Sequence, residues 1–291
     1  TAGPGPAVRR FRRPMKRIDL HIHTRASDGH ASPTAVVDAA VAGRLDVIAV
    51  TDHDTVAGVR EACDAARERP VRVVPGIEVS ARHADAEIHV LGYFVDPEAD
   101  PLVRHSEGAR ERRADRARRM VGRLQEQGVP LEFEDVLREA GPNAASIGRP
   151  HIARALLAGG HTRYYGEAFD LYLADGRSAF VLTEFPTVRE AIDMIHAGGG
   201  LAVWAHPPME MFDREIRTFA AWGLDGVECF RPGTPPAESH LLETAARSLG
   251  LLRSGGSDWH GPHRSQLGQF AVREDVVRDL LDAGSRLPPR G

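Results

Sequence analysis

A series of short apolar runs, each ending in histidine or a carboxylate, constrains this chain of 291 residues more than any other feature. The first run, Ile18 to His23, alternates apolar and polar residues, and this pattern predicts a β-strand. Side chains two positions apart on a strand point to the same face, so we expect His21 and His23 to lie together near its end. Two imidazoles directed at one point are typical of a metal site.

The same arrangement returns along the chain. It recurs in Thr-Asp-His at 51–53, Gly-Ile-Glu at 76–78, Ile-His at 88–89, Ala-His-Pro at 205–207 and Ser-Asp-Trp-His at 257–260. With the first run and its loop, the candidate metal ligands are His21, His23, Asp28, His53, Glu78, His89, His206, Asp258 and His260. Imidazole suits Zn, Fe and Mn, and carboxylates can bridge two ions. The pattern therefore predicts a multinuclear metal centre at one mouth of a strand-rich barrel.

The spacing of the apolar runs indicates an α/β fold. They end near Leu20, Val50, Val74, Val95, Trp204, Glu228 and Leu252. Helical patterns separate most of them, at 32–42, 56–69, 187–197, 212–221 and 238–248. This alternation favours βα units and a mostly parallel sheet that is closed or nearly closed.

The stretch between 100 and 180 breaks the alternation, because it is helical throughout. Its patterns cover 102–127, 133–140, 148–158 and 164–174. We interpret it as a helical insertion that grows from one barrel loop and covers the active site. The predicted organisation is a disordered tail at 1–16, a discontinuous barrel at 17–99 and 181–285, and the insertion at 100–180.

Composition excludes several classes of protein. The formal net charge is −4, which does not favour a general polyanion binder. The cysteines, Cys63 and Cys229, lie far apart and form no C-x-x-C motif, so a reducing, cytoplasmic location is expected. No apolar run approaches the roughly 20 residues that span a bilayer, and we expect no membrane partner. Nothing in the pattern points to an obligate protein partner.

These motifs resemble those of the PHP (polymerase and histidinol phosphatase) family of metal-dependent phosphoesterases. The resemblance rests on His-x-His-Thr-x-x-Ser-Asp-Gly at 21–29, Thr-Asp-His-Asp at 51–54 and the segments above, and it covers residues 18 to about 275. It implies a distorted seven-stranded (β/α) barrel, the PHP fold. Gly-Arg-Pro-His-Ile-Ala at 148–153 and Tyr-Leu-x-x-Gly-Arg at 172–177 are similar to a stand-alone bacterial branch. That branch acts on nucleoside 3′,5′-bisphosphates and short RNA 5′ ends.

The resemblance also implies how two or three divalent ions (Mn, Fe or Zn) would be shared. One ion would be held by His21, His23, Glu78 and Asp258. Glu78 would bridge to a second ion held with His89 and His206. Asp28, His53 and His260 would form a third site.

Phosphoester chemistry assigns expected roles to several residues. Two metals lower the pKa of a shared water and hold phosphate oxygens for in-line attack by the bridging hydroxide. The expected catalytic residues are Glu78, Asp28, His53, His206 and His260, with a third ion, His206 or His260 left open as the source of the leaving-group proton. For phosphate groups not under attack we expect Arg149, Arg177 and Ser80, since the guanidinium fork matches phosphate oxygens.

The arginine-rich stretch at 104–123 could either bind nucleic acid or form a solvated, ion-paired helix. Arg112, Arg116, Arg119 and Arg123 share a helix face at helical spacing. A basic helix above the site could guide an RNA 5′ end. Acidic residues lie within one turn, however, so a solvated, ion-paired helix is the favoured interpretation.

We therefore predict hydrolysis of a nucleotide phosphate monoester, specifically the 3′-phosphate of adenosine 3′,5′-bisphosphate. One alternative is a 5′-3′ exonuclease on short 5′-phosphorylated RNA, and another is a phosphatase for a small metabolite such as histidinol phosphate. A non-enzymatic alternative is a metal-stabilised interaction module. The expected partner is a small phosphorylated substrate, in the second case short RNA.

Overall fold

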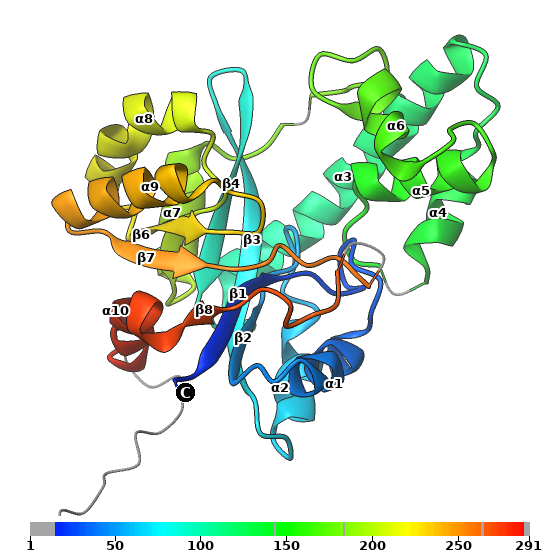
Figure 1. Cartoon of the computed structure of the whole chain (residues 1–291). Helices are drawn as coiled ribbons and strands as arrows, with labels where there is room; N and C mark the ends of the chain where they lie inside the picture. The colour runs from blue at the N-terminus through cyan, green and yellow to red at the C-terminus, as the bar shows by residue number, and fades with distance from the viewer. Residues whose placement is uncertain (1–14, 143, 183, 263–264, 288–291) are drawn as a thin grey trace, which may run out of the picture.

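The computed structural model describes residues 15–142, 144–182, 184–262 and 265–287 (Figure 1). Its strands are β1 (Arg17–Ile22), β2 (Val47–Val50), β3 (Arg72–His83), β4 (Ala86–Tyr93), β5 (Leu201–Trp204), β6 (Gly226–Phe230), β7 (Leu252–Gly255) and β8 (Val272–Arg273). The helices of the barrel are α1 (Pro33–Ala42), α2 (Val59–Ala66), α7 (Val188–Ala197), α8 (Met209–Ala221), α9 (Pro236–Ser248) and α10 (Glu274–Ser285). The remaining helices are α3 (Asp100–Glu126), α4 (Phe133–Ala140), α5 (Arg149–Ala158), α6 (Tyr165–Ala168) and the π-helix η1 (Phe169–Leu173).

The eight strands form one sheet in the order β7-β6-β5-β4-β3-β2-β1-β8. The chain that leaves β7 brings the two sides of the sheet together beside β1. There the Trp259 amide donates to the His21 carbonyl (3.3 Å) and the His23 amide donates to the Trp259 carbonyl (2.9 Å). The sheet is thus a nearly closed barrel, and the predicted α/β barrel with a helical insertion is confirmed.

Two features of the sheet differ from the prediction. β4 pairs antiparallel with both β3 and β5. The two residues Ala84 and Asp85 connect β3 to β4, and so short a link permits only an antiparallel β3–β4 pair. β8 is an eighth strand, antiparallel to β1. Its two residues are too few to give a periodic signal in the sequence.

Side-chain packing fixes the outer layer of helices. The side chains of Ile192 and Ile195 from α7 and Phe212 and Phe219 from α8 share one buried cluster with Trp204 of β5. α1 and α2 cover β1 and β2 through a second cluster. Local caps agree with the predicted helix starts: Ser32 Oγ accepts from the Ala35 amide (3.2 Å) ahead of Pro33 at the first helical position.

The helices between 100 and 173 stand to one side of the barrel in Figure 1. Buried residues between Ala117 and Val181 make up a hydrophobic cluster of their own. Because this cluster draws on no barrel strand, we propose that 100–180 is an insertion domain, and 17–99 with 181–285 the barrel. Of the predicted tail, residues 1–14 lie outside the described residues. Within the described part, no helix is long and apolar enough to cross a membrane.

Candidate metal centre and phosphate site

The structure brings all nine candidate ligands together at one mouth of the barrel. His21 belongs to β1 and His23 follows it, after an irregularity in the pairing of β1 with β2. Glu78 and His89 lie on the β3–β4 hairpin, and His206 follows β5. Asp28, His53, Asp258 and His260 lie in the loops after β1, β2 and β7. We call these nine residues the ligand cluster.

Glu78 is the centre of the ligand cluster and is fully buried. Its two carboxylate oxygens lie 2.9–3.2 Å from nitrogens of five imidazoles, those of His21, His23, His53, His89 and His206. A carboxylate offers about four lone-pair sites, so five imidazoles exceed what hydrogen bonding to it can satisfy. This crowding is the arrangement expected when the nitrogens and the carboxylate surround cations rather than one another.

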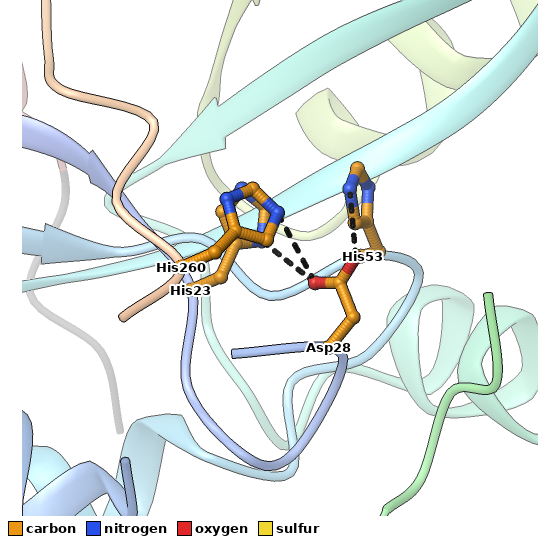
Figure 2. Close-up of side chains that lie close together, drawn as sticks. All are labelled: His23, Asp28, His53 and His260. Atoms are coloured by element: carbon orange, nitrogen blue, oxygen red, sulfur yellow. Dashed lines mark ion pairs between the residues drawn. The ribbon is translucent and has the colours of Figure 1, made fainter. Parts of the chain in front are cut away.

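A second group surrounds Asp28. Figure 2 shows its carboxylate between the imidazoles of His23 and His260 on one side and His53 on the other. The oxygen–nitrogen distances are 3.3 Å to His260, 3.8 Å to His23 and 3.9 Å to His53. Burial raises the pKa of Asp28, but the charge and the hydrogen bond of the nearby His260 outweigh it and hold the pKa well below its usual range. The carboxylate is therefore ionised.

Unsatisfied atoms provide a test of whether metal ions fit here. Both ring nitrogens of His23 and Nδ1 of His53 are buried without a hydrogen-bond partner. His23 Nε2 nevertheless lies 3.1 Å from Asp258 and 3.2 Å from Glu78, so these atoms are close but not aligned for hydrogen bonds. Buried polar atoms are normally paired. A donor set of imidazoles and carboxylates directed at shared points fits divalent ions.

The histidines of the ligand cluster differ in proton affinity. Burial lowers the pKa of His53 to about 3, which leaves the neutral imidazole that metals bind. Burial also opposes the charge on His23 and His89, but the carboxylates close to each ring outweigh it. Asp258 and Glu78 raise the pKa of His23 to about 10, and Glu78 with Glu87 raises that of His89 to about 9.

Glu228 in the middle of β6 supports two members of the ligand cluster and was not predicted. Its Oε1 lies 2.9 Å from His21 Nδ1, which directs Nε2 of His21 toward Glu78. Its Oε2 accepts from the His206 amide (2.9 Å), where the backbone has a positive φ of 32°. A carboxylate behind a ligand histidine fixes the tautomer and the ring orientation.

Three arginines from the insertion form the opposite side of the cavity: Arg113 and Arg116 of α3 and Arg149 of α5. We call them the arginine wall. Arg113 Nε donates to Asp54 (2.7 Å) and its Nη2 to Ser80 Oγ (2.7 Å). Arg116 Nε donates to the Val181 carbonyl (2.9 Å) and its Nη2 to Glu87 (3.1 Å). Among the described residues, these bonds leave Nη1 of both arginines for a ligand.

Carboxylates and an aromatic ring orient the arginine wall. Burial raises the pKa of Asp54, but Arg113 and His105 hold it far below its usual range, so the carboxylate stays ionised. Glu87 is likewise held below its usual pKa against burial, by the His89 hydrogen bond and the charges of Arg149 and Arg116. Phe185 lies under both α3 guanidiniums, with its centroid 5.9 Å from Arg113 Cζ and 5.6 Å from Arg116 Cζ.

The prediction that the arginines of α3 lie on a solvated, ion-paired face was therefore wrong in part. Arg119 and Arg123 are exposed as expected, but Arg116 is buried, and so is Arg113, which the assumed face omitted. The buried face follows Leu102, His105, Ala109, Arg113, Arg116 and Met120. The sequence signal that could have identified it is the spacing of Leu102, Ala109 and Met120, which places Arg113 and Arg116 on the apolar face.

The other predicted phosphate contacts are placed differently. Arg149 lines the cavity, with Nη1 2.6 Å from Asp175 and Nη2 3.5 Å from Glu87. Ser80 is fully buried beneath Arg113 and does not line the cavity. Arg177 is exposed and does not line it either. Arg177 lies in the loop after η1, and this position gives no support for a contact between its side chain and a phosphate in the cavity.

The cavity between the ligand cluster and the arginine wall has a volume of about 290 Å³. Pro150 and two aromatic residues, Tyr165 and Phe169, add an apolar side. The two rings lie 5.5 Å apart at an angle of 53°. One cavity thus combines metal ligands, guanidinium groups and a surface on which a flat ring can pack.

Comparison with known proteins agrees with this geometry. The model of the PHP domain matches residues 19–135. A 5′-3′ exoribonuclease of Haemophilus influenzae is 36% identical over 85% of this chain and 91% of its own length. A 3′,5′-nucleoside bisphosphate phosphatase of Chromobacterium violaceum is 34% identical over 85% of this chain and 88% of its own length.

Solved structures show the same fold. An amidohydrolase from Chromobacterium violaceum, solved with bound sulfate and without metal, superposes with a TM-score of 0.84 at 32% identity. The match covers 92% of this chain and 96% of that chain. The insertion and the barrel are therefore both part of what the two proteins share.

Proposed function

Because the chain belongs to the PHP family and is a metal-dependent phosphoesterase, we propose that it removes the 3′-phosphate from nucleoside 3′,5′-bisphosphates such as adenosine 3′,5′-bisphosphate. The observation that carries this proposal is the pairing of the ligand cluster with the arginine wall in one cavity. A phosphate under attack belongs beside metal ligands, whereas a second phosphate that is only held belongs beside guanidiniums.

The residues of the chain divide the work accordingly. The nine residues of the ligand cluster would hold the divalent ions, which when bound supply a nucleophilic water and neutralise charge on the transferred phosphoryl group. Arg113, Arg116 and Arg149 bind the 5′-phosphate and so orient the 3′-phosphate toward Glu78. Tyr165 and Phe169 pack against the base. Asp28, His53, His206 and His260 line the cavity where the leaving 3′-oxygen takes its proton.

The names of the relatives support two readings of the substrate. The Chromobacterium violaceum relative is named a nucleoside bisphosphate phosphatase, and the Haemophilus influenzae relative a 5′-3′ exoribonuclease. A nucleoside 3′,5′-bisphosphate and a 5′-phosphorylated RNA both carry a 5′-phosphate on the nucleotide whose P–O3′ bond breaks, and the arginine wall suits such a phosphate. A small metabolite with one phosphate, such as histidinol phosphate, would leave the arginine wall without a ligand, so we favour it less.

The test is a timed product analysis with adenosine 3′,5′-bisphosphate and 3′-AMP as parallel substrates of the metal-loaded protein. We expect 5′-AMP from the bisphosphate and little turnover of 3′-AMP, which lacks the 5′-phosphate. Arg116→Ala should lower kcat/KM for the bisphosphate by about 10- to 100-fold, since a hydrogen bond to a charged group contributes about 1.5–3 kcal/mol.

The matched control is Arg177→Ala, which removes an exposed arginine outside the cavity and should leave the bisphosphate activity unchanged. Equal activity on the bisphosphate and on 3′-AMP would contradict the proposal, because it would mean that the 5′-phosphate is not recognised.

A further inference from the structure

A second cavity, of about 230 Å³, adjoins the first. His206 and Arg231 line both cavities, so the two are neighbours across these side chains. The rest of its lining comes chiefly from the loop after β5 and the start of α8 (Pro207, Met209), the loop after β6 (Thr234) and α9 (Leu242). The proposed bisphosphate substrate ends at its 3′-phosphate, so it does not account for this space.

Arg231 differs from the arginine wall in its pairing. Arg113, Arg116 and Arg149 each have a carboxylate oxygen within 3.5 Å. Within the described part of the chain, no carboxylate lies within ion-pair distance of the half-buried Arg231. Its positive charge at the junction of the cavities is therefore available to an anion that is not part of the protein.

The anion near Arg231 can be identified by comparing the bond that breaks in a nucleoside bisphosphate with the bond that breaks in RNA. In a nucleoside 3′,5′-bisphosphate, water attacks the 3′-phosphorus, the P–O3′ bond breaks and the 3′-oxygen takes up a proton. Removing the first nucleotide of a 5′-phosphorylated RNA as a 5′-monophosphate breaks the same P–O3′ bond. The only difference is that the attacked phosphorus also carries the O5′ of the next nucleotide, which remains on the 5′-phosphorylated remainder.

We propose that the second cavity receives the nucleotide that follows the scissile phosphate and that Arg231 binds the next phosphate along the strand. The inference rests on the proposed function, because it places the 5′-phosphate on the arginine wall and the scissile phosphate at the ligand cluster. The second cavity then decides whether the site accepts oligonucleotides in addition to nucleoside bisphosphates.

The lining of the second cavity suits a nucleoside. Met209, Pro207 and Leu242 give apolar surface for a base or sugar. Glu228 also lines this cavity, but its two oxygens are already engaged by His21 and the His206 amide. Glu238 is the other carboxylate here, and it can accept hydrogen bonds from a base amino group or a ribose hydroxyl.

The kinetic test compares adenosine 3′,5′-bisphosphate with the 5′-phosphorylated trinucleotide pApApA, whose second internal phosphate would reach Arg231. Wild-type protein should cleave both. Arg231→Ala should lower kcat/KM for pApApA by about 10- to 100-fold, a larger loss than for the bisphosphate, whose cavity Arg231 also lines. Thr234→Trp, which narrows the second cavity without touching the first, should have the same selectivity. Arg217→Ala, an exposed arginine of α8, is the control.

A structural readout accompanies the kinetics. A 5′-phosphorylated trinucleotide with 4-thiouridine at its second position is irradiated with the protein in EDTA, and the cross-linked peptide is mapped by mass spectrometry. We expect cross-links to residues 206–209 or 231–242. Cross-links confined to the insertion would overturn the inference.

The outcomes separate the two proposals. Failure of the wild type to cleave the bisphosphate would overturn the proposed function. Cleavage of the bisphosphate without cleavage of pApApA would overturn only the inference. An equal loss on both substrates in Arg231→Ala would also overturn it, because Arg231 would then serve the shared phosphate site.

Discussion

The two sides of the first cavity differ in how their buried charged groups are satisfied. In the arginine wall, Asp54, Glu87 and Ser80 meet the guanidiniums at hydrogen-bonding distance. In the ligand cluster, His23 and His53 keep buried nitrogens without partners although carboxylates lie close by. The guanidiniums of the arginine wall thus have hydrogen-bond partners within the protein. The unpaired nitrogens of the ligand cluster gain partners only when ions bind.

The two sides of the cavity are therefore preorganised for binding in different ways. The arginine wall holds its donors rigid before substrate arrives, so little order is lost on binding. The ligand cluster keeps strained positions instead: His206 and Asp258 both have positive φ, at 32° and 53°. Non-glycine residues in this region cost free energy and persist where the surrounding structure holds them. Variants of the ligand cluster should therefore lose bound metal, whereas variants of the arginine wall should lose stability whether or not metal is present.

The largest effect is expected for Glu78→Gln, which removes the charge shared by five imidazoles. We expect kcat/KM for the bisphosphate to fall by about 10³-fold or more, together with a loss of bound metal by elemental analysis. In the wild type, added Mn²⁺ should raise Tm by mass action. The variant should show much less of this increase. Retention of full metal content would contradict the role of Glu78 at the centre.

Asp54→Ala tests the arginine wall by removing the carboxylate under Arg113. Because Asp54 is fully buried and bonded to Arg113 and His105, its loss leaves an unpaired buried guanidinium. We expect a loss of about 3 kcal/mol in the free energy of unfolding in urea, and it should appear without metal as well as with it. If only the metal-loaded form were destabilised, the contrast between the two sides would be wrong.

Glu228→Gln addresses the support behind the ligand cluster. The amide keeps the shape but weakens the contact to His21 Nδ1 and to the His206 amide. Metal affinity, measured by competition with a chelator, should fall about 10- to 100-fold, and excess metal should restore most of kcat. A loss of kcat that excess metal does not restore would assign Glu228 a different role.

The smallest effect is expected for a histidine outside both sides of the cavity. His196 Nε2 lies 2.7 Å from Asp225, and this hydrogen bond raises its pKa. Its contribution is therefore fully present below the unfolded pKa of about 6.5 and is lost as pH rises through the folded pKa. Since the pair is partly exposed, the contribution should stay below about 1 kcal/mol.

The measurement for His196 is the stability difference between wild type and His196→Gln in urea at about pH 5.5 and about pH 9. The difference should be larger at the lower pH. The opposite trend would mean that Asp225 does not hold the protonated form.

The sequence predicted the members of the ligand cluster because each follows its own short apolar run, which is a local signal. For the residues that follow parallel strands, convergence needed only the rule that the carboxyl ends of such strands meet at one mouth of a barrel, whereas Glu78 and His89 lie within the antiparallel β3–β4 pair. The arginine wall depends on which face of α3 docks on the barrel, and a shift from Arg112 to Arg113 changes the outcome. Arg177 looked equivalent to Arg149 in motif context, but its loop leads it into solvent. Glu228 was not predicted because nothing local separates a supporting carboxylate from a core strand residue.

The β3–β4 hairpin joins the two sides of the cavity. In its register Ser80 pairs with His89, Arg82 with Glu87 and Glu78 with Leu91, so one face of the ribbon carries Glu78 and His89 with Ser80 and Glu87. A single inserted or deleted residue in either strand would turn part of this set to the opposite face. A change in the length of the loops between the insertion helices would not disturb this register. A designer who wants a new specificity should therefore rebuild the insertion and leave residues 76–93 intact.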